Sequence, residues 1–177
     1  MHWGEEYQSL PNREQRELAG WLLEQGVTHI IGSHPHVIQP MELHTNGNQQ
    51  HVIVYSLGNF ISNMSAANTD GGLIFTLQLE KYPLPAPIHP LQNNLSYSPS
   101  LEPFALSFPF ARVVRCGYTL VWTGRPALTG EKNYILYPSY SPHSHLPQSA
   151  RNHLNIFIKN TRKFLIQHNT EIYENNK

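Results

Sequence analysis

The amino-acid sequence predicts an α/β fold, because a helical pattern and several strand patterns follow one another along the chain. Apolar residues recur at helical spacing over 13–25, while short apolar runs at 27–31, 52–55 and 73–79 are typical of strands. A turn that carries two histidines, residues 32–36, comes directly after the first of these strands. Because α/β proteins place their sites at the ends of strands, this turn is the first candidate site.

Length and composition restrict the class of protein. A chain of 177 residues is long enough for one domain with a sizeable core. Lys and Arg together number 12 and so do Asp and Glu, so we expect no nucleic-acid partner. No apolar run approaches the length of a membrane span, and we expect no membrane segment in this chain. Cys116 is the single cysteine, and core filling is a more plausible role for it than catalysis.

The helix predicted over 13–25 has signals at both ends. Asn12 can cap its N-terminus, with Gln15 returning the bond in a capping box, and Gly26 ends the run. A turn at 46–48 predicts two strands, 37–43 and 51–55, joined by a loop. The second strand is apolar on both faces, so we expect it to be covered on both sides.

Composition divides the chain into three parts. Residues 1–80 carry the elements described above, and residues 81–110 form a Pro-rich loop or insertion. Residues 111–177 complete the domain with further strands and a C-terminal helix. We expect these strands at 111–123 and 134–137. We also expect Ser149 to cap the helix, and its apolar stripe consists of Leu154, Phe157, Ile158 and Leu165.

The histidine turn suggests metal chemistry. Pro35 separates His34 from His36 and should hold His34 in an extended conformation, and two imidazoles held in this way can share a metal ion. His2 would join them if the opening loop lies at the same edge of the sheet. The alternative is a surface turn in a chain that contains 11 histidines. His143 and His145 repeat the spacing in a Pro- and Ser-rich loop, where we expect surface residues.

Other polar residues lie in or near the same turns. Glu5, Glu6, Glu42 and Asn59 could be ligands, partners of the ligands or substrate contacts. Each glutamate could equally be a solvated loop carboxylate, and Asn59 could be an ordinary turn residue after Gly58. Aromatic residues beside such a turn, here Trp3 and Tyr7, more often pack against the core than line a pocket.

Three successive motifs within residues 1–79 closely resemble the bacterial capsule-synthesis (CapA, or poly-γ-glutamate synthesis) family of the calcineurin-like metallophosphoesterase superfamily. They are His2-Trp3-Gly4-x-Glu6-Tyr7, then Gly32-Ser33-His34-Pro35-His36-Val37 with Gln39-Pro40 and Glu42, and then Tyr55-Ser56-Leu57-Gly58-Asn59-Phe60-Ile61-Ser62. The resemblance implies a metallophosphoesterase-type sandwich of mixed sheets flanked by helices.

The resemblance also implies site residues and a cofactor. His2, His34 and His36 correspond to metal ligands of a two-metal catalytic site, and Glu6, Glu42 and Asn59 to supporting or substrate-contacting positions. The cofactor would be divalent Mn, Fe or Zn. The substrate would be a small molecule or a polymer, and other polymer-synthesis subunits would be partners. Full-length family members are often associated with the cell envelope, but the compartment of this chain does not follow from its sequence.

Family members also carry an N-terminal half with Asp, Glu, Asn and His motifs that this sequence does not show. We therefore expect the fold to be incomplete and the two-metal site to be partly present. Because three histidines without a bridging aspartate would hold at most one metal ion, we expect the chain alone to be weak or inactive as a phosphoesterase. The alternatives to a hydrolase-type protein are a non-catalytic assembly or scaffold subunit of an envelope polymer machine, and an inactive gene fragment.

Overall fold

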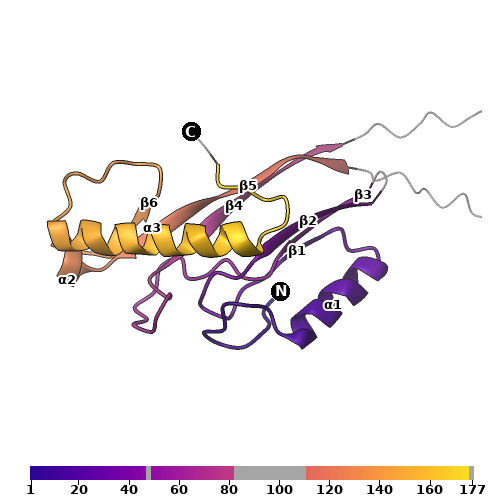
Figure 1. Ribbon diagram of the computed structural model, residues 1–177, viewed down its shortest axis with the longest axis horizontal. Helices are drawn as coiled ribbons and strands as arrows, with labels where there is room; N and C mark the ends of the chain where they lie inside the picture. The colour runs from indigo at the N-terminus through magenta and orange to yellow at the C-terminus, as the bar shows by residue number, and fades with distance from the viewer. Residues whose placement is uncertain (47–48, 82–110, 176–177) are drawn as a thin grey trace, which may run out of the picture.

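The computed structural model describes residues 1–46, 49–81 and 111–175, and these residues form an α/β structure as predicted (Figure 1). The turn expected at 46–48 and the Pro-rich segment expected at 81–110 fall almost wholly outside the described residues. The elements, in chain order, are α1 (Arg13–Glu24), β1 (His29–Ile31), β2 (Met41–Asn46), β3 (Gln49–Val54), β4 (Gly71–Lys81), β5 (Ala111–Gly124), α2 (Pro126–Thr129), β6 (Ile135–Pro138) and α3 (Gln148–His168).

The first sheet has the strand order β1-β3-β2. β1 runs parallel to β3, and β2 runs antiparallel to it, so the predicted pair of neighbouring strands is confirmed. β2 begins at Met41 rather than at residue 37. Pro40, which has no N–H group to donate, comes just before it. Ahead of Pro40 the chain makes only isolated contacts, such as the bridge between Ile38 and Leu57.

The second sheet has the strand order β4-β5-β6 and is antiparallel throughout. Its strands lie close to the predicted positions. A bridge between Gly58 and Gly72 joins the end of the first sheet to the start of β4. The segment after β3 therefore runs between the two sheets, and it carries Asn59 with it.

The alternation of side chains along β3 divides the core in two. Val52 and Val54 point into the larger cluster, which also contains residues of the second sheet and of α3. Ile53 and Tyr55 point the other way, to a smaller cluster with Trp3 and residues of α1. Helices α1 and α3 thus lie on opposite sides of the first sheet (Figure 1), and the expectation that this strand is covered on both sides is confirmed.

Local sequence signals predicted the start of α1 correctly but not the start of α3. Asn12 and Gln15 form the predicted capping box at α1, with bonds of 2.9 and 3.0 Å, and Gly26 follows the helix with a φ of 91°. The predicted cap of α3 at Ser149 is wrong, because the helix already begins at Gln148, after Pro147, and has no side-chain cap. The fixed φ of Pro147 suits a position just before a helix.

The interior of α3 follows the predicted stripe. Leu154, Phe157 and Leu165 are buried, and Ile158 packs against the same core. The short helix α2 was not predicted. Across the part of the chain that the structure describes, no helix is both long and apolar enough to cross a membrane.

Candidate metal centre

The opening loop and the histidine turn lie side by side at the end of β1. The N–H group of Ser33 donates to the carbonyl of Met1 at 2.9 Å, and that of Trp3 donates to the carbonyl of Ser33 at 3.2 Å. Further along, the N–H group of Tyr7 donates to the carbonyl of Pro35 at 2.7 Å. Residues 1–7 therefore form a second layer of backbone along the turn, and this layer brings His2 and Glu6 to it.

Gly32 allows this close approach. A Cβ atom at residue 32 would lie 2.3 Å from Nε1 of Trp3 and 2.3 Å from the carbonyl oxygen of Tyr55. Those two atoms are joined by a hydrogen bond of 2.8 Å in which the indole donates. Trp3 is buried and stacks on the Tyr55 ring, as expected for an aromatic residue that packs against the core. Gly32 thus lies directly on the hydrogen-bonded pair of Trp3 and Tyr55.

The backbone of the turn is strained. His34 has a φ of 110° and His36 a φ of 60°, which side chains with a Cβ rarely adopt. The prediction that Pro35 holds His34 extended is therefore wrong. The backbone hydrogen bonds from the opening loop to Ser33 and Pro35 fix the turn on both sides of His34, and they outweigh the local preference.

Three potential ligands converge at this turn. Glu6, His34 and His36 each offer a ligand atom within 4.8 Å of the other two, and among the described residues no other group of three does so. Oε1 of Glu6 lies 3.7 Å from Nε2 of His36. The glutamate is exposed, and the two histidines are half-buried. The structure also brings the predicted ligand His2 to this turn, with its ring centroid 4.2 Å from that of His34.

Asn59 determines which nitrogen of His36 is available. Its amide nitrogen donates to the carbonyl of Thr69 at 3.0 Å and lies 3.5 Å from the sulfur of Met64, which fixes the orientation of the amide. Its oxygen therefore faces Nδ1 of His36, at 3.0 Å. An amide oxygen only accepts, so Nδ1 must carry the proton and donate. In the neutral imidazole the lone pair is then on Nε2, the nitrogen that faces Glu6.

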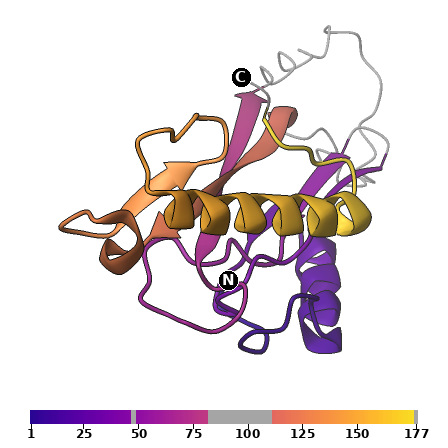
Figure 2. The same cartoon turned by 60° about the vertical axis from the view of Figure 1, so that its left-hand side comes forward.

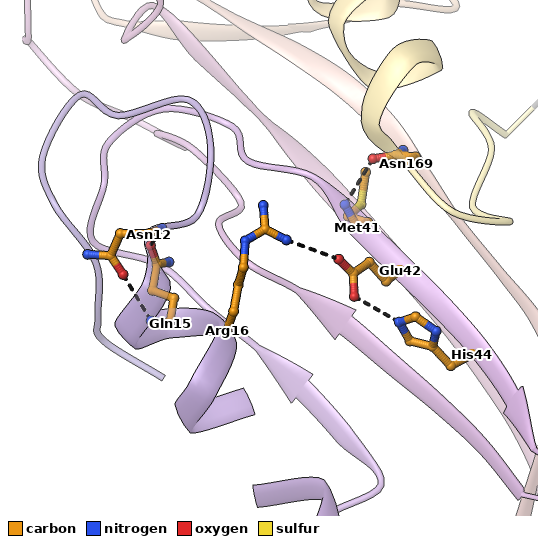
Figure 3. A network of polar contacts seen from close by, with 7 residues as sticks. All are labelled: Asn12, Gln15, Arg16, Met41, Glu42, His44 and Asn169. Carbon is orange, nitrogen blue, oxygen red and sulfur yellow. Dashed lines mark hydrogen bonds and ion pairs between the residues drawn. The ribbon is translucent and has the colours of Figure 1, made fainter. Parts of the chain in front are cut away.

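Glu42 is not brought to the cluster. Its carboxylate lies 2.8 Å from Nε2 of His44 and 4.0 Å from the guanidinium of Arg16, on the surface between α1 and β2 (Figure 3). The side chain of Glu5 is exposed beside the turn. Tyr7 is also exposed, and its ring centroid lies 6.3 Å from that of His36.

Two buried glutamines support the opening loop, and sequence reasoning gave them no such role. Nε2 of Gln15, in α1, donates to Oε1 of Gln39 at 2.9 Å, and Nε2 of Gln39 donates to the carbonyl of Gln8 at 2.9 Å. A Cβ atom on Gly4 would lie 2.6 Å from the amide of Gln15. The only signals in the sequence were Gln39 in the second family-like motif and Gln15 in the capping box of the helix.

The remaining candidate residues lie elsewhere. His145 is exposed and His143 is half-buried, with its Nε2 2.8 Å from the carbonyl of Pro138. Cys116 packs against the larger core cluster, and burial raises the pKa of its thiol, which favours the unreactive neutral form. The core-filling role expected for this cysteine agrees with its position.

The fold and the cluster define an α/β protein with a candidate divalent-metal centre, and comparisons with known proteins show which family its N-terminal segment resembles. Residues 1–64 match the model of the bacterial capsule synthesis protein PGA_cap. The PGA biosynthesis protein CapA of Bacillus subtilis (strain 168) is 41% identical over 80 residues, which are 45% of this chain and 20% of that protein. The capsule biosynthesis protein CapA of Bacillus anthracis is 39% identical over 74 residues, which are 41% of this chain and 17% of that protein.

These matches confirm that the N-terminal segment of this chain resembles the bacterial capsule-synthesis family. All the residues that converge at the turn lie inside the matched segment. The chain spans about a fifth of the length of these relatives. No solved structure matches the chain.

Proposed function

We propose that this chain supplies the histidine side of a divalent-metal centre in a hydrolase-type protein of capsule or poly-γ-glutamate synthesis. The observation that carries the proposal is the convergence of Glu6, His34 and His36, with Asn59 facing Nδ1 of His36 and Nε2 directed at Glu6. The family match supports the link to capsule synthesis. It does not by itself identify a reaction, so the activity rests on the geometry of the cluster.

The donor set suits the proposed cofactor. Imidazole nitrogens and a carboxylate oxygen are ligands that Zn, Mn and Fe all accept. Three such donors and the neighbouring His2 are sufficient for one ion, which is the number we propose for this chain. An ion held there would act as a Lewis acid on an oxygen of a phosphate, amide or peptide group. The two-metal site of the superfamily would require further ligands.

The residues around the cluster have separate tasks in this proposal. Asn59 holds the proton of His36 on Nδ1, and the pair of Gln15 and Gln39 fixes the loop that carries Glu6. Because Glu6 is exposed, the cluster is open to solvent on that side. Such a site can admit part of a long polymer as well as a small substrate.

The activity can be tested with the purified chain, two chromogenic substrates and each of Mn²⁺, Fe²⁺ and Zn²⁺. p-Nitrophenyl phosphate reports phosphoester hydrolysis, and γ-glutamyl-p-nitroanilide reports amide hydrolysis. We expect slow turnover of one substrate that depends on the ion and falls at least tenfold in His36→Ala. The control is His145→Ala, which removes an exposed histidine of the second His-x-His pair. This variant should retain the turnover of the unmodified chain.

Turnover that is independent of the ion, or equal in His36→Ala and the unmodified chain, would contradict the hydrolase proposal. Fast phosphoester turnover that His36→Ala abolishes would contradict the expectation of weak activity from this chain alone. No turnover with any ion would favour a non-catalytic scaffold role.

A further inference from the structure

A pocket of about 250 Å³ lies outside the metal cluster, between the segment that follows β3 and the start of α2. Figure 2 shows α2 and the N-terminal end of α3 close together at this end of the molecule. The large apolar side chains of Trp122 and Leu128 line the pocket. Its polar lining includes Asn68, Asp70, Arg125 and His153. The pocket therefore combines an apolar surface with opposite charges.

The two charges do not neutralise each other. The guanidinium of Arg125 donates to the backbone carbonyl of Met64, and the carboxylate of Asp70 accepts from Nε1 of Trp122 at 3.2 Å. Within residues 1–46, 49–81 and 111–175, neither Arg125 nor Asp70 forms an ion pair. Both residues are half-buried. Partial burial removes some of the water that would stabilise each charge, and among the described residues no side chain of opposite charge replaces it.

We propose that this pocket binds a small zwitterion, an α-amino acid, with its carboxylate on Arg125 and its ammonium group on Asp70. A ligand that carries both charges would compensate both protein groups at once through charge-assisted hydrogen bonds. Its side chain would lie against Trp122 and Leu128. The volume suits a ligand of this size, because pockets for drug-sized molecules are generally larger.

The wall of the pocket is held in place before any ligand binds. The N–H group of Thr123 donates to the carbonyl of Asp70 at 2.8 Å, and its hydroxyl donates to the carbonyl of Phe60 at 2.8 Å. The hydroxyl of Thr69 donates to the carbonyl of Ala66 at 2.7 Å. Binding would therefore order little of the chain, and this lowers its entropic cost.

The site is separate from the proposed metal centre in residues and in chemistry. Asn59 contacts both regions, because its amide donates to Thr69 and its oxygen accepts from His36. None of the residues that line the pocket is a proposed metal ligand. Amino-acid binding should therefore persist in a chelator and in His36→Ala.

The first test uses the unmodified chain in EDTA and measures affinity by isothermal titration calorimetry. The probes are L-alanine, L-leucine and L-glutamate, together with 4-methylpentanoate and 3-methylbutylamine, which each carry one of the two charges of leucine. We expect at least one amino acid to bind, and leucine to bind at least tenfold more tightly than either singly charged compound. Absence of binding by all three amino acids, or equal binding of a singly charged compound, would overturn the proposal.

The second test locates the site. Arg125→Gln and Asp70→Asn remove one charge each and should weaken binding at least tenfold, while Glu131→Gln, at an exposed residue, should leave it unchanged. Circular dichroism checks that the variants fold. Unchanged affinity in both pocket variants would overturn the proposal. If a variant does not fold, the affinities of leucine and the two singly charged compounds for the unmodified chain still show whether the ligand needs both charges.

Discussion

At His36, two neighbouring side chains face the two nitrogens of one imidazole ring. Asn59 accepts from Nδ1 at 3.0 Å, and Glu6 faces Nε2 at 3.7 Å. The orientation of Asn59 is itself fixed by Thr69, so the ring is held by a chain of bonds that leads back to the segment between the sheets. A ligand held in this way needs no rearrangement before it binds an ion.

Replacing Asn59 tests this arrangement directly. In the unmodified chain we expect long-range ¹H–¹⁵N spectra of the metal-free protein to show the His36 proton on Nδ1. In Asn59→Leu the ring loses its acceptor, so the two tautomers should mix, and Zn²⁺ affinity should fall about tenfold to a hundredfold.

Asn155→Leu, at an exposed residue of α3, is the matched control for this substitution, and it should change neither the tautomer nor the affinity. A His36 proton that stays on Nδ1 in Asn59→Leu, with unchanged Zn²⁺ affinity, would show that Asn59 has no such role.

Residues that depend on distant partners were the hardest to predict. The local rule for a residue before proline gave an extended His34, but the opening loop overrides it. Glu42 pairs in register with Ile53, whose side chain belongs to the cluster that packs on α1. Residues paired in register share one face of the sheet, so Glu42 is directed toward Arg16 of α1 and not toward the histidines.

The elements were predicted best where the signal is local. The capping box defines the start of α1, and the apolar stripe of α3 is buried as its spacing requires. The start of β2 and the short helix α2 were missed. β2 begins only after Pro40, and the helix of four residues, Pro126–Thr129, is too short for a periodic pattern.

In the candidate site, too, the features with a local sequence signal were predicted and those that depend on distant contacts were not. A strand followed by Gly32 was enough to indicate the turn that carries His34 and His36. The motifs of the opening loop indicated Glu6. Asn59 was expected among the partners of the ligands. Its contact with Nδ1 of His36 and the support from Gln39 could not be predicted, because each joins segments more than 20 residues apart.

At the scale of the whole molecule, the C-terminal segment after α3 connects the two sheets. Thr170 exchanges backbone hydrogen bonds with Met41 and Leu43 of β2, and Asn175 donates to the carbonyl of Tyr118 in β5 at 2.7 Å. Ile172 between them is buried in the larger cluster. This segment therefore acts as a brace between the sheets, and it also carries Glu174, whose carboxylate accepts hydrogen bonds from Ser139 and Arg162.

Glu174 should make the stability of this brace depend on pH. Burial alone would raise the pKa of its carboxyl, but hydrogen bonds from Arg162 and Ser139 outweigh burial and lower it. A lowered pKa in the folded state adds stability above the ordinary value of 4.5, and this stability is lost as the pH falls through the lowered value. Glu174→Gln should therefore lower the free energy of unfolding by about 1 kcal/mol at pH 7, and by progressively less below pH ~4.

Urea unfolding between pH 7 and pH 3 measures this difference, with the exposed Glu131→Gln as control. A difference between Glu174→Gln and the unmodified chain that stays constant down to pH 3 would exclude the titration of Glu174 as its cause.

The central claim is that Glu6, His34 and His36 form one divalent-metal site, and a calorimetric titration of the chelator-treated chain with Zn²⁺ tests it most directly. We expect one tight ion per chain. We also expect at least tenfold weaker binding in each of Glu6→Gln, His34→Ala and His36→Ala, and unchanged binding in His145→Ala. Equal affinity in His36→Ala and the unmodified chain, or loss of the ion in His145→Ala, would contradict it.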